Sequence, residues 1–222
     1  MAEPARRVRD TPFAYACHRC RRCCHDKRIH VNPYEVARLA RNRALSTTDV
    51  LERYTTAAGT ELQTTDTGAC VFLTDAGCGV HADRPLVCRL YPLGRHIDTD
   101  GGETFSELAP HPETEGVYSL FGTVDAYLEA QGVRPFTAAA DRYLELITRL
   151  SARLSEAVQA DPEVETDVRA ALDAPTEGTI PEWLDLDRVV EAWRRERDLP
   201  PPATIEDAMA MHIEALDHGG PR

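Results

Sequence analysis

The pattern of apolar and polar residues predicts a helix that begins soon after residue 31. Asn32 is a suitable N-cap, Pro33 fits the first helical turn, and Glu35 has the spacing of a capping box. Apolar residues then recur at helical spacing, at Val36, Leu39 and Ala40. A second helix is expected to begin at Ser46, with Asp49 at the matching capping-box position.

The part of the chain after residue 110 is predicted to be helical throughout, because its apolar residues form stripes at helical spacing. The stripes are Tyr118, Phe121, Val124 and Leu128; Phe136, Ala140, Tyr143, Ile147, Leu150, Leu154 and Val158; Trp183, Leu186, Val190 and Trp193; and Ile205, Met209, His212, Ile213 and Leu216. The last stripe follows a Thr204-x-x-Asp207 cap. Joints that contain proline or glycine separate them, at 132–135, 174–181 and 199–203. Trp183, Trp193 and His212 are expected in the core.

The segment before residue 110 has a different character. It contains all seven cysteines and many turn-forming residues, such as Asp98-Thr99-Asp100-Gly101-Gly102. We therefore predict a mainly α protein in two parts. Residues 1–110 would form a loop-rich module organised by cysteines and metal, and residues 111–222 a small helical bundle.

Composition excludes some classes of protein. The 222 residues are 42% hydrophobic, which is enough for a packed core. No apolar run approaches the roughly 20 residues that cross a membrane, and the arginines of Met1–Asp10 precede no apolar stretch, so a secretory signal is not expected. The prediction is a cytoplasmic protein.

A net charge of −12 argues against binding to duplex nucleic acid, although residues 1–30 carry a local +5.

The cysteines are the main candidates for chemistry. Four of them, Cys17, Cys20, Cys23 and Cys24, fall within eight consecutive residues, and Cys70, Cys78 and Cys88 follow later. An odd number without an export signal disfavours a disulfide framework, whereas Cys-x-x-Cys spacing brings two thiolates onto one metal or cluster. A helix would turn Cys23 away from the others, and an extended segment would point Cys23 and Cys24 to opposite faces. We therefore expect these two to reach different irons of one cluster, or different sites.

Other residues near the cysteines are weaker candidates. His25, His81 and His96 could each complete a ligand set, with His81 best placed, but a lone histidine is more often solvated. Arg84 and Arg89 bracket Cys88. Their charges would offset that of an anionic cluster and raise its reduction potential; equally, they could pair with surface acids.

These motifs together resemble a known family. The resemblance runs from about Phe13 to Arg95 and rests on Cys17-x-x-Cys20-x-x-Cys23-Cys24, Cys70-Val71-Phe72-Leu73, Cys78-Gly79-Val80-His81 and Arg84-Pro85-Leu86-Val87-Cys88-Arg89-Leu90-Tyr91-Pro92. The pattern is similar to the CxxCxxCC cysteine-cluster family, a zinc- or iron-chelating domain also described as YkgJ-type. The family usually has glycine where this chain has Arg21-Arg22, and tyrosine before Arg-Pro where this chain has His81-Ala82-Asp83.

The resemblance implies a metal domain with all seven cysteines as candidate ligands. Distant relatives include flagellin lysine N-methylases, which carry a 4Fe–4S cluster and use S-adenosylmethionine. The leading expectation is therefore a 4Fe–4S protein in redox chemistry or S-adenosylmethionine-dependent group transfer, an oxidoreductase or a methyltransferase-like enzyme, with Arg84 and Arg89 available to the methionyl carboxylate. The alternative is a zinc-organised structural module whose helical half binds a protein partner. The chain lacks Cys-x-x-x-Cys-x-x-Cys, which disfavours an ordinary radical S-adenosylmethionine enzyme.

Overall fold

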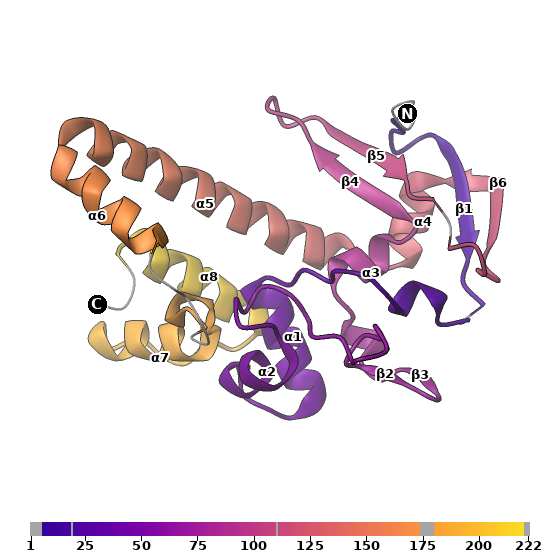
Figure 1. Cartoon of the computed structure of the whole chain (residues 1–222), viewed down its shortest axis with the longest axis horizontal. Coiled ribbons are helices and arrows are strands. Elements are labelled where there is room, and N and C mark those ends of the chain that lie inside the picture. The colour runs from indigo at the N-terminus through magenta and orange to yellow at the C-terminus, as the bar shows by residue number, and fades with distance from the viewer. Residues whose placement is uncertain (1–5, 19, 110, 174–179, 220–222) are drawn as a thin grey trace. The chain divides into compact units, whose positions relative to one another are not determined.

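The computed structural model describes residues 6–18, 20–109, 111–173 and 180–219 (Figure 1). Within these residues the chain forms eight α-helices, three short 3-10 helices and six strands, paired into three two-stranded sheets. The fold is thus a mixture of helix and strand, and the expected mainly α class is only partly right. No helix of this described part is long and apolar enough to cross a membrane.

The described chain divides into two compact units, each built from two separate stretches of sequence. The first unit consists of residues 6–31 and 61–137, and the second of residues 32–60 and 138–219. The boundary that we expected near residue 110 marks a change of composition, and as a division into domains it stays a prediction.

The first unit contains all six strands. Its elements are β1 (Pro12–Ala16), the 3-10 helix η1 (Arg22–Cys24), β2 (Leu73–Thr74), β3 (Gly77–Cys78), the 3-10 helix η2 (His81–Asp83), α3 (Leu86–Leu90), β4 (Leu93–Ile97), β5 (Glu103–Glu107), β6 (Val117–Thr123) and α4 (Val124–Ala130). The antiparallel pairs are β1 with β6, β2 with β3, and β4 with β5. The pairing of β1 with β6 places Tyr15 opposite Tyr118, although the two residues are far apart in the sequence.

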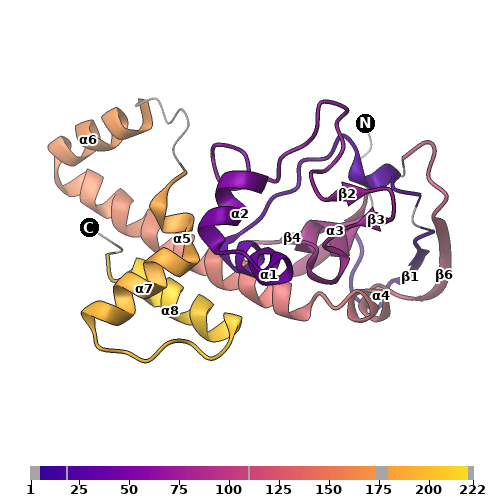
Figure 2. The same ribbon diagram turned by 90° about the horizontal axis from the view of Figure 1, so that it is seen from below.

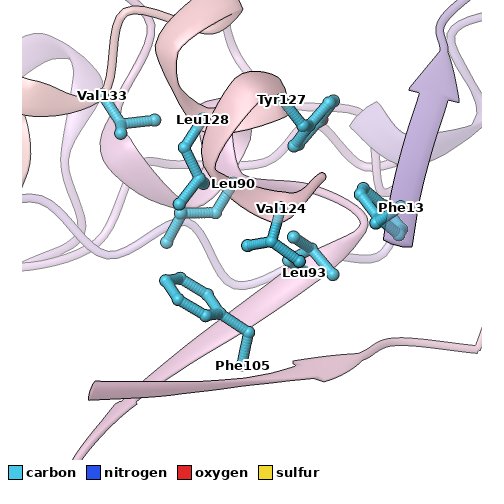
Figure 3. Packing of buried hydrophobic residues seen from close by; sticks show 8 residues of the cluster. All are labelled: Phe13, Leu90, Leu93, Phe105, Val124, Tyr127, Leu128 and Val133. Atoms are coloured by element: carbon cyan, nitrogen blue, oxygen red, sulfur yellow. The ribbon is translucent and has the colours of Figure 1, made fainter. Parts of the chain in front are cut away.

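One apolar cluster holds these elements together. Figure 3 shows its buried side chains, which are Phe13, Leu90, Leu93, Phe105, Val124, Tyr127, Leu128 and Val133. The rings of Phe13 and Tyr127 meet edge to face, with centroids 5.1 Å apart. The cluster joins β1, which leads to Cys17, to α3, which carries Cys88. Apolar burial therefore brings the first and last cysteine segments into one unit.

The helix expected over the stripe Tyr118–Leu128 is wrong in its first half. Residues up to Thr123 form β6, and Phe121 is 91% exposed instead of buried. The helix α4 begins at Val124, where the Thr123 hydroxyl accepts a hydrogen bond from the Ala126 N–H at 3.2 Å. Pairing with β1 satisfies the backbone of the preceding residues, so the strand is favoured over a longer helix.

The second unit contains the other helices. They are α1 (Pro33–Arg43), α2 (Thr47–Tyr54), α5 (Arg134–Ala160), α6 (Pro162–Asp173), the 3-10 helix η3 (Glu182–Leu184), α7 (Leu186–Glu196) and α8 (Ile205–Asp217); the first residues of α5 belong to the first unit. Helix α7 packs against α8, and α1 contacts α2, α7 and α8 (Figure 2). The capping boxes predicted at Asn32, Ser46 and Thr204 are all present.

Two predicted core residues of this unit are confirmed and one is wrong. His212 is fully buried and Trp193 is 7% exposed. Trp183 is 44% exposed, because it lies in η3, before α7 begins. The long stripe of α5 is buried only in the first half of the helix, at Phe136 and Tyr143, since Ile147 and Leu154 are about half exposed. Most of the joint expected at 174–181 lies outside the described residues.

Candidate metal centre

The first cysteines lie between β1 and a single turn of 3-10 helix. Arg21 adopts a left-handed conformation, with φ of 67°, and starts η1, which carries Cys23 and Cys24. The sulfur atoms of these two neighbours are only 4.0 Å apart. Of the two local geometries that we considered, the extended one is therefore not the one that forms, because these two residues lie in a tight 3-10 turn. The expectation that they reach different irons or different sites stays a prediction.

Backbone pairing brings Cys70 to this turn. The Cys70 N–H donates to the Cys24 carbonyl oxygen at 2.8 Å, and His25 forms an antiparallel bridge with Ala69. Cys78 follows in β3, where it pairs with Leu73 of β2 (Figure 1). The Leu73 N–H in turn donates to the Cys70 carbonyl oxygen, so main-chain hydrogen bonds connect the three cysteine-bearing turns.

The fourth segment is α3, which carries Cys88. The charges of Cys78 and Cys88 both act on Cys24. The pKa of Cys24 is raised above its ordinary value, first by the hydrogen bond with Cys23, then by burial, and then by the nearby charges of Cys23, Cys88 and Cys78. We call Cys23, Cys24, Cys70, Cys78 and Cys88 the thiol group.

Electrostatics within the thiol group oppose full ionisation in the absence of a cation. Burial raises the pKa of Cys70, and the charge of Cys78 raises it further. The pKa of Cys23 is instead lowered to about 7, chiefly by its hydrogen bond with Cys24. All five thiols are half-buried and reduced. Several thiols that cannot all ionise next to one another are a donor set suited to a thiophilic cation, which would neutralise them together.

The thiol group is not a finished metal site. Nowhere in residues 6–18, 20–109, 111–173 and 180–219 do three His, Cys, Asp or Glu side chains converge closely enough to hold one ion. The thiols suit a soft metal by their chemistry and because their turns lie near one another. To bind one ion, the thiols would have to move closer together.

The other two predicted ligands lie elsewhere in the first unit. Cys17 is exposed at the end of β1, and its charge reaches Tyr15 and Tyr127. Cys20 lines an open cleft of about 850 Å³. Arg21, Arg22, His25, Leu73, Thr74, Asp75 and Glu115 line the remainder of this cleft. The assignment of Cys17 and Cys20 as metal ligands stays a prediction.

The three candidate histidines make contacts of their own. His25 Nδ1 lies 3.2 Å from the Arg21 carbonyl oxygen, and His96 Nε2 lies 2.8 Å from the Ser106 hydroxyl. His81, the best placed by sequence, is exposed at the start of η2. The first two are thus held by hydrogen bonds within the unit.

The two arginines that bracket Cys88 form hydrogen bonds within the protein. Arg89 is 6% exposed and donates to the carbonyl oxygens of Arg84, Gln131 and Ala82 at 2.6–2.9 Å. Its guanidinium also stacks 3.9 Å from the centre of the Phe136 ring. Arg84 donates to the His81 carbonyl oxygen and to Gln131 Oε1, both at 2.7 Å. These contacts brace α3 against the turn after α4, which positions Cys88.

The structure assembles three tyrosines of the first unit into one group, which sequence reasoning did not predict. The ring of Tyr15 contacts the rings of Tyr91 and Tyr118, with centroid distances of 5.9 and 4.9 Å. Burial raises the pKa of Tyr15 to about 12, and the charges of Cys17 and Cys23 contribute to this increase. The positions of Tyr15, just before the first cysteine, and of Tyr91, just after the last, could have indicated these two members of the group. The position of Tyr118 could not, because it depends on the pairing of β1 with β6.

Comparison with known protein families matches the same segment. Residues 16–109 match the model of the CxxCxxCC family, described as a “putative zinc- or iron-chelating domain”. Comparison with curated proteins gives no match, and neither does comparison with solved structures. The matched range contains all seven cysteines and every turn of the thiol group. Residues 16–109 are therefore similar to a zinc- or iron-chelating domain of this family, and the match supports metal binding by the cysteines.

Proposed function

We propose that the thiol group holds a 4Fe–4S cluster, with four of its five cysteines as ligands. The observation that carries this proposal is that main-chain hydrogen bonds join the turns of Cys24, Cys70 and the β2–β3 hairpin. Cys78 and Cys88 are also near enough to Cys24 for their charges to raise its pKa. Four thiolates from such turns are the common protein ligand set of a 4Fe–4S cluster. When bound, such a cluster exchanges single electrons, so the function that we propose is redox chemistry.

The spacing of the thiols supports a cluster over a single ion. Bonds of about 2.3 Å in a tetrahedron place the sulfurs on one zinc about 3.8 Å apart. Among the described residues, no group of three candidate ligands is arranged to hold a single ion. A polynuclear cluster bridges sulfurs that stand further apart, and it therefore needs less movement of the three turns.

One observation favours the zinc alternative. The sulfurs of Cys23 and Cys24 are 4.0 Å apart, close to the separation that one tetrahedral zinc imposes. In this alternative the ion ties η1 to the later turns and stabilises the first unit, and the domain has a structural function. The helical second unit would then bind a protein partner.

S-adenosylmethionine-dependent group transfer gains no support from the arginines. The donors that a methionyl carboxylate would need are the ones that Arg89 uses on three carbonyl oxygens. Arg84 is similarly engaged with His81 and Gln131. We therefore confine the proposal to metal binding and the redox chemistry of the cluster.

Metal analysis of protein made with both metals available tests the proposal. The chain is expressed with excess iron and zinc, purified without oxygen, and assayed for iron, acid-labile sulfide and zinc. We expect about four irons and four sulfides per chain. A variant with serine at Cys24, Cys70, Cys78 and Cys88 is the control for adventitious metal and should contain neither.

Each other result decides against the cluster. One zinc per chain without sulfide, lost in the serine variant, would replace the cluster with the structural zinc site. Equal metal in wild type and serine variant would show that the thiol group binds no metal.

A further inference from the structure

The open cleft beside the first cysteines is lined by charged side chains of both signs. Its volume of about 850 Å³ is within the range of small-molecule sites in proteins. The segment 20–25 lines one part of it and includes Arg21 and Arg22. The turn after β2 contributes Asp75, and the segment before β6 contributes Glu115. All of these residues belong to the first unit.

Several of these charges have no ion-pair partner within the protein. Arg21 donates to the main-chain oxygen of Asp75 at 3.2 Å, and in the described part of the chain its guanidinium forms no ion pair. The carboxylates of Asp75 and Glu115 likewise form none with the described residues. Arg22 pairs with Glu113 at 3.0 Å, but both side chains are at least half exposed, so a ligand can replace this weak pair. Other arginines of the same unit do pair with carboxylates; they are Arg6, Arg7, Arg9, Arg28 and Arg95.

A cleft that offers both signs of charge suits a ligand that carries both. Guanidinium groups bind carboxylates through two parallel hydrogen bonds, and carboxylates bind ammonium groups. Arg21 and Arg22 can therefore receive the carboxylate of a zwitterion, while Asp75 and Glu115 receive its ammonium group. A ligand with charge of only one sign would meet like charge in the same cleft.

The thiol of Cys20 adds a reactive atom to the cleft. Cys20 is half-buried and reduced, and it lines the cleft without belonging to the thiol group. A cysteine thiolate exchanges with a disulfide that is held beside it. A zwitterionic ligand that contains a disulfide would therefore use both the charges and the thiol.

We propose that this cleft binds a small zwitterionic disulfide of the amino-acid class and that Cys20 forms a mixed disulfide with it. The Cys20 thiol loses its proton to water, and its sulfur attacks one sulfur of the ligand. The ligand's S–S bond breaks as the new S–S bond forms, and the other half leaves as a thiolate that takes up a proton. The ligand is thus the oxidant and is reduced to one thiol, while Cys20 is oxidised. The inference goes beyond metal binding, because Cys20 is outside the thiol group.

The test compares three small disulfides on protein purified without oxygen. Cystine carries both charges, cystamine lacks the carboxylates, and dithiodipropionate lacks the ammonium groups. Mass spectrometry of peptides gives the initial rate of mixed-disulfide formation at Cys20 and at Cys17. Cys17 is exposed and does not line the cleft, so the ratio of the two rates removes the intrinsic reactivity of each reagent.

We expect the ratio of the Cys20 rate to the Cys17 rate to be about 10-fold higher for cystine than for the other two reagents. This is the effect of about one hydrogen bond to a charged group. In 1 M salt, where the screening length is about 3 Å, the three ratios should converge. Arg21→Gln and Asp75→Asn should each lower the ratio for cystine several-fold. Neither should change the melting temperature, because both side chains are exposed.

Arg28→Gln is the matched control. It removes an exposed arginine of the same unit that pairs with Glu61 and does not line the cleft, so it should leave the ratio for cystine unchanged. Equal ratios for the three reagents, or a ratio for cystine that neither cleft variant lowers, would overturn the inference. Cys20 that reacts with none of them would also overturn it and would favour Cys20 as a metal ligand. None of these results bears on metal binding by the thiol group, which uses other cysteines.

Discussion

His212 illustrates how a single side chain is fixed by its surroundings. It is fully buried on α8, with Nδ1 at 3.0 Å from the Tyr143 hydroxyl and Nε2 at 2.9 Å from the Trp183 carbonyl oxygen. Burial lowers its pKa to about 4, from 6.5, although the contacts with Trp183 and Asp185 act in the opposite direction. The neutral imidazole is thus part of the second unit's core.

The low pKa of His212 predicts a loss of stability in mild acid. The unfolded chain takes up a proton near pH 6.5 and the folded chain only near pH 4, so stability falls as the pH is lowered through this window. Between pH 7 and pH 5 we expect His212 to account for a loss of about 2 kcal/mol. Urea unfolding of wild type and His212→Gln at both pH values measures this contribution. An equal change in the two proteins would contradict it.

Several residues of the candidate site could be predicted from sequence because their signal is local. Cys17, Cys20, Cys23 and Cys24 stand out by crowding alone. The function of Arg89 could not be predicted, because its three carbonyl partners are brought together only by the fold.

At the scale of elements, the start of α1 depends on a reciprocal cap. The Asn32 side chain accepts from the Glu35 N–H at 3.0 Å, and the Glu35 carboxylate accepts from the Asn32 N–H at 3.0 Å. Asn32→Ala should lower the free energy of unfolding by about 1 kcal/mol, because helix donors lose their acceptor. Urea unfolding followed by circular dichroism measures the change. Arg43→Ala, at the exposed other end of the helix, is the control and should change it by less than about 0.5 kcal/mol. Equal effects would show that the cap adds nothing.

The elements also show where a periodic pattern fails. Caps at Asn32, Ser46 and Thr204 act within four residues, and the predictions based on them are confirmed. Tyr118 and Phe121 have helical spacing too, but β6 forms because its backbone pairs with β1. Strand pairing between distant segments overrides a short helical pattern, and apolar periodicity in one segment contains no information about a remote partner.

At the scale of the whole molecule, the chain leaves the first unit after residue 31 and returns to it at residue 61. The intervening residues form α1 and α2 of the second unit. The matched range 16–109 therefore contains two helices, α1 and α2, that pack with helices of the second unit. A boundary at residue 110 reflects only the change in composition there. The turns at Cys24, Cys70, Cys78 and Cys88 remain together in the first unit, so a metal bound there would stabilise that unit.

The central claim, that the thiol group binds metal, is tested most directly by thiol footprinting. Protein purified without oxygen is treated with iodoacetamide, before and after metal removal by a chelator under denaturing conditions and refolding, and the extent of modification of each cysteine is determined by mass spectrometry. We predict that at least four thiols of the group Cys23, Cys24, Cys70, Cys78 and Cys88 are modified more slowly in metal-loaded than in metal-free protein, because bound thiolates cannot react. Similar modification of these five with and without metal would contradict the account.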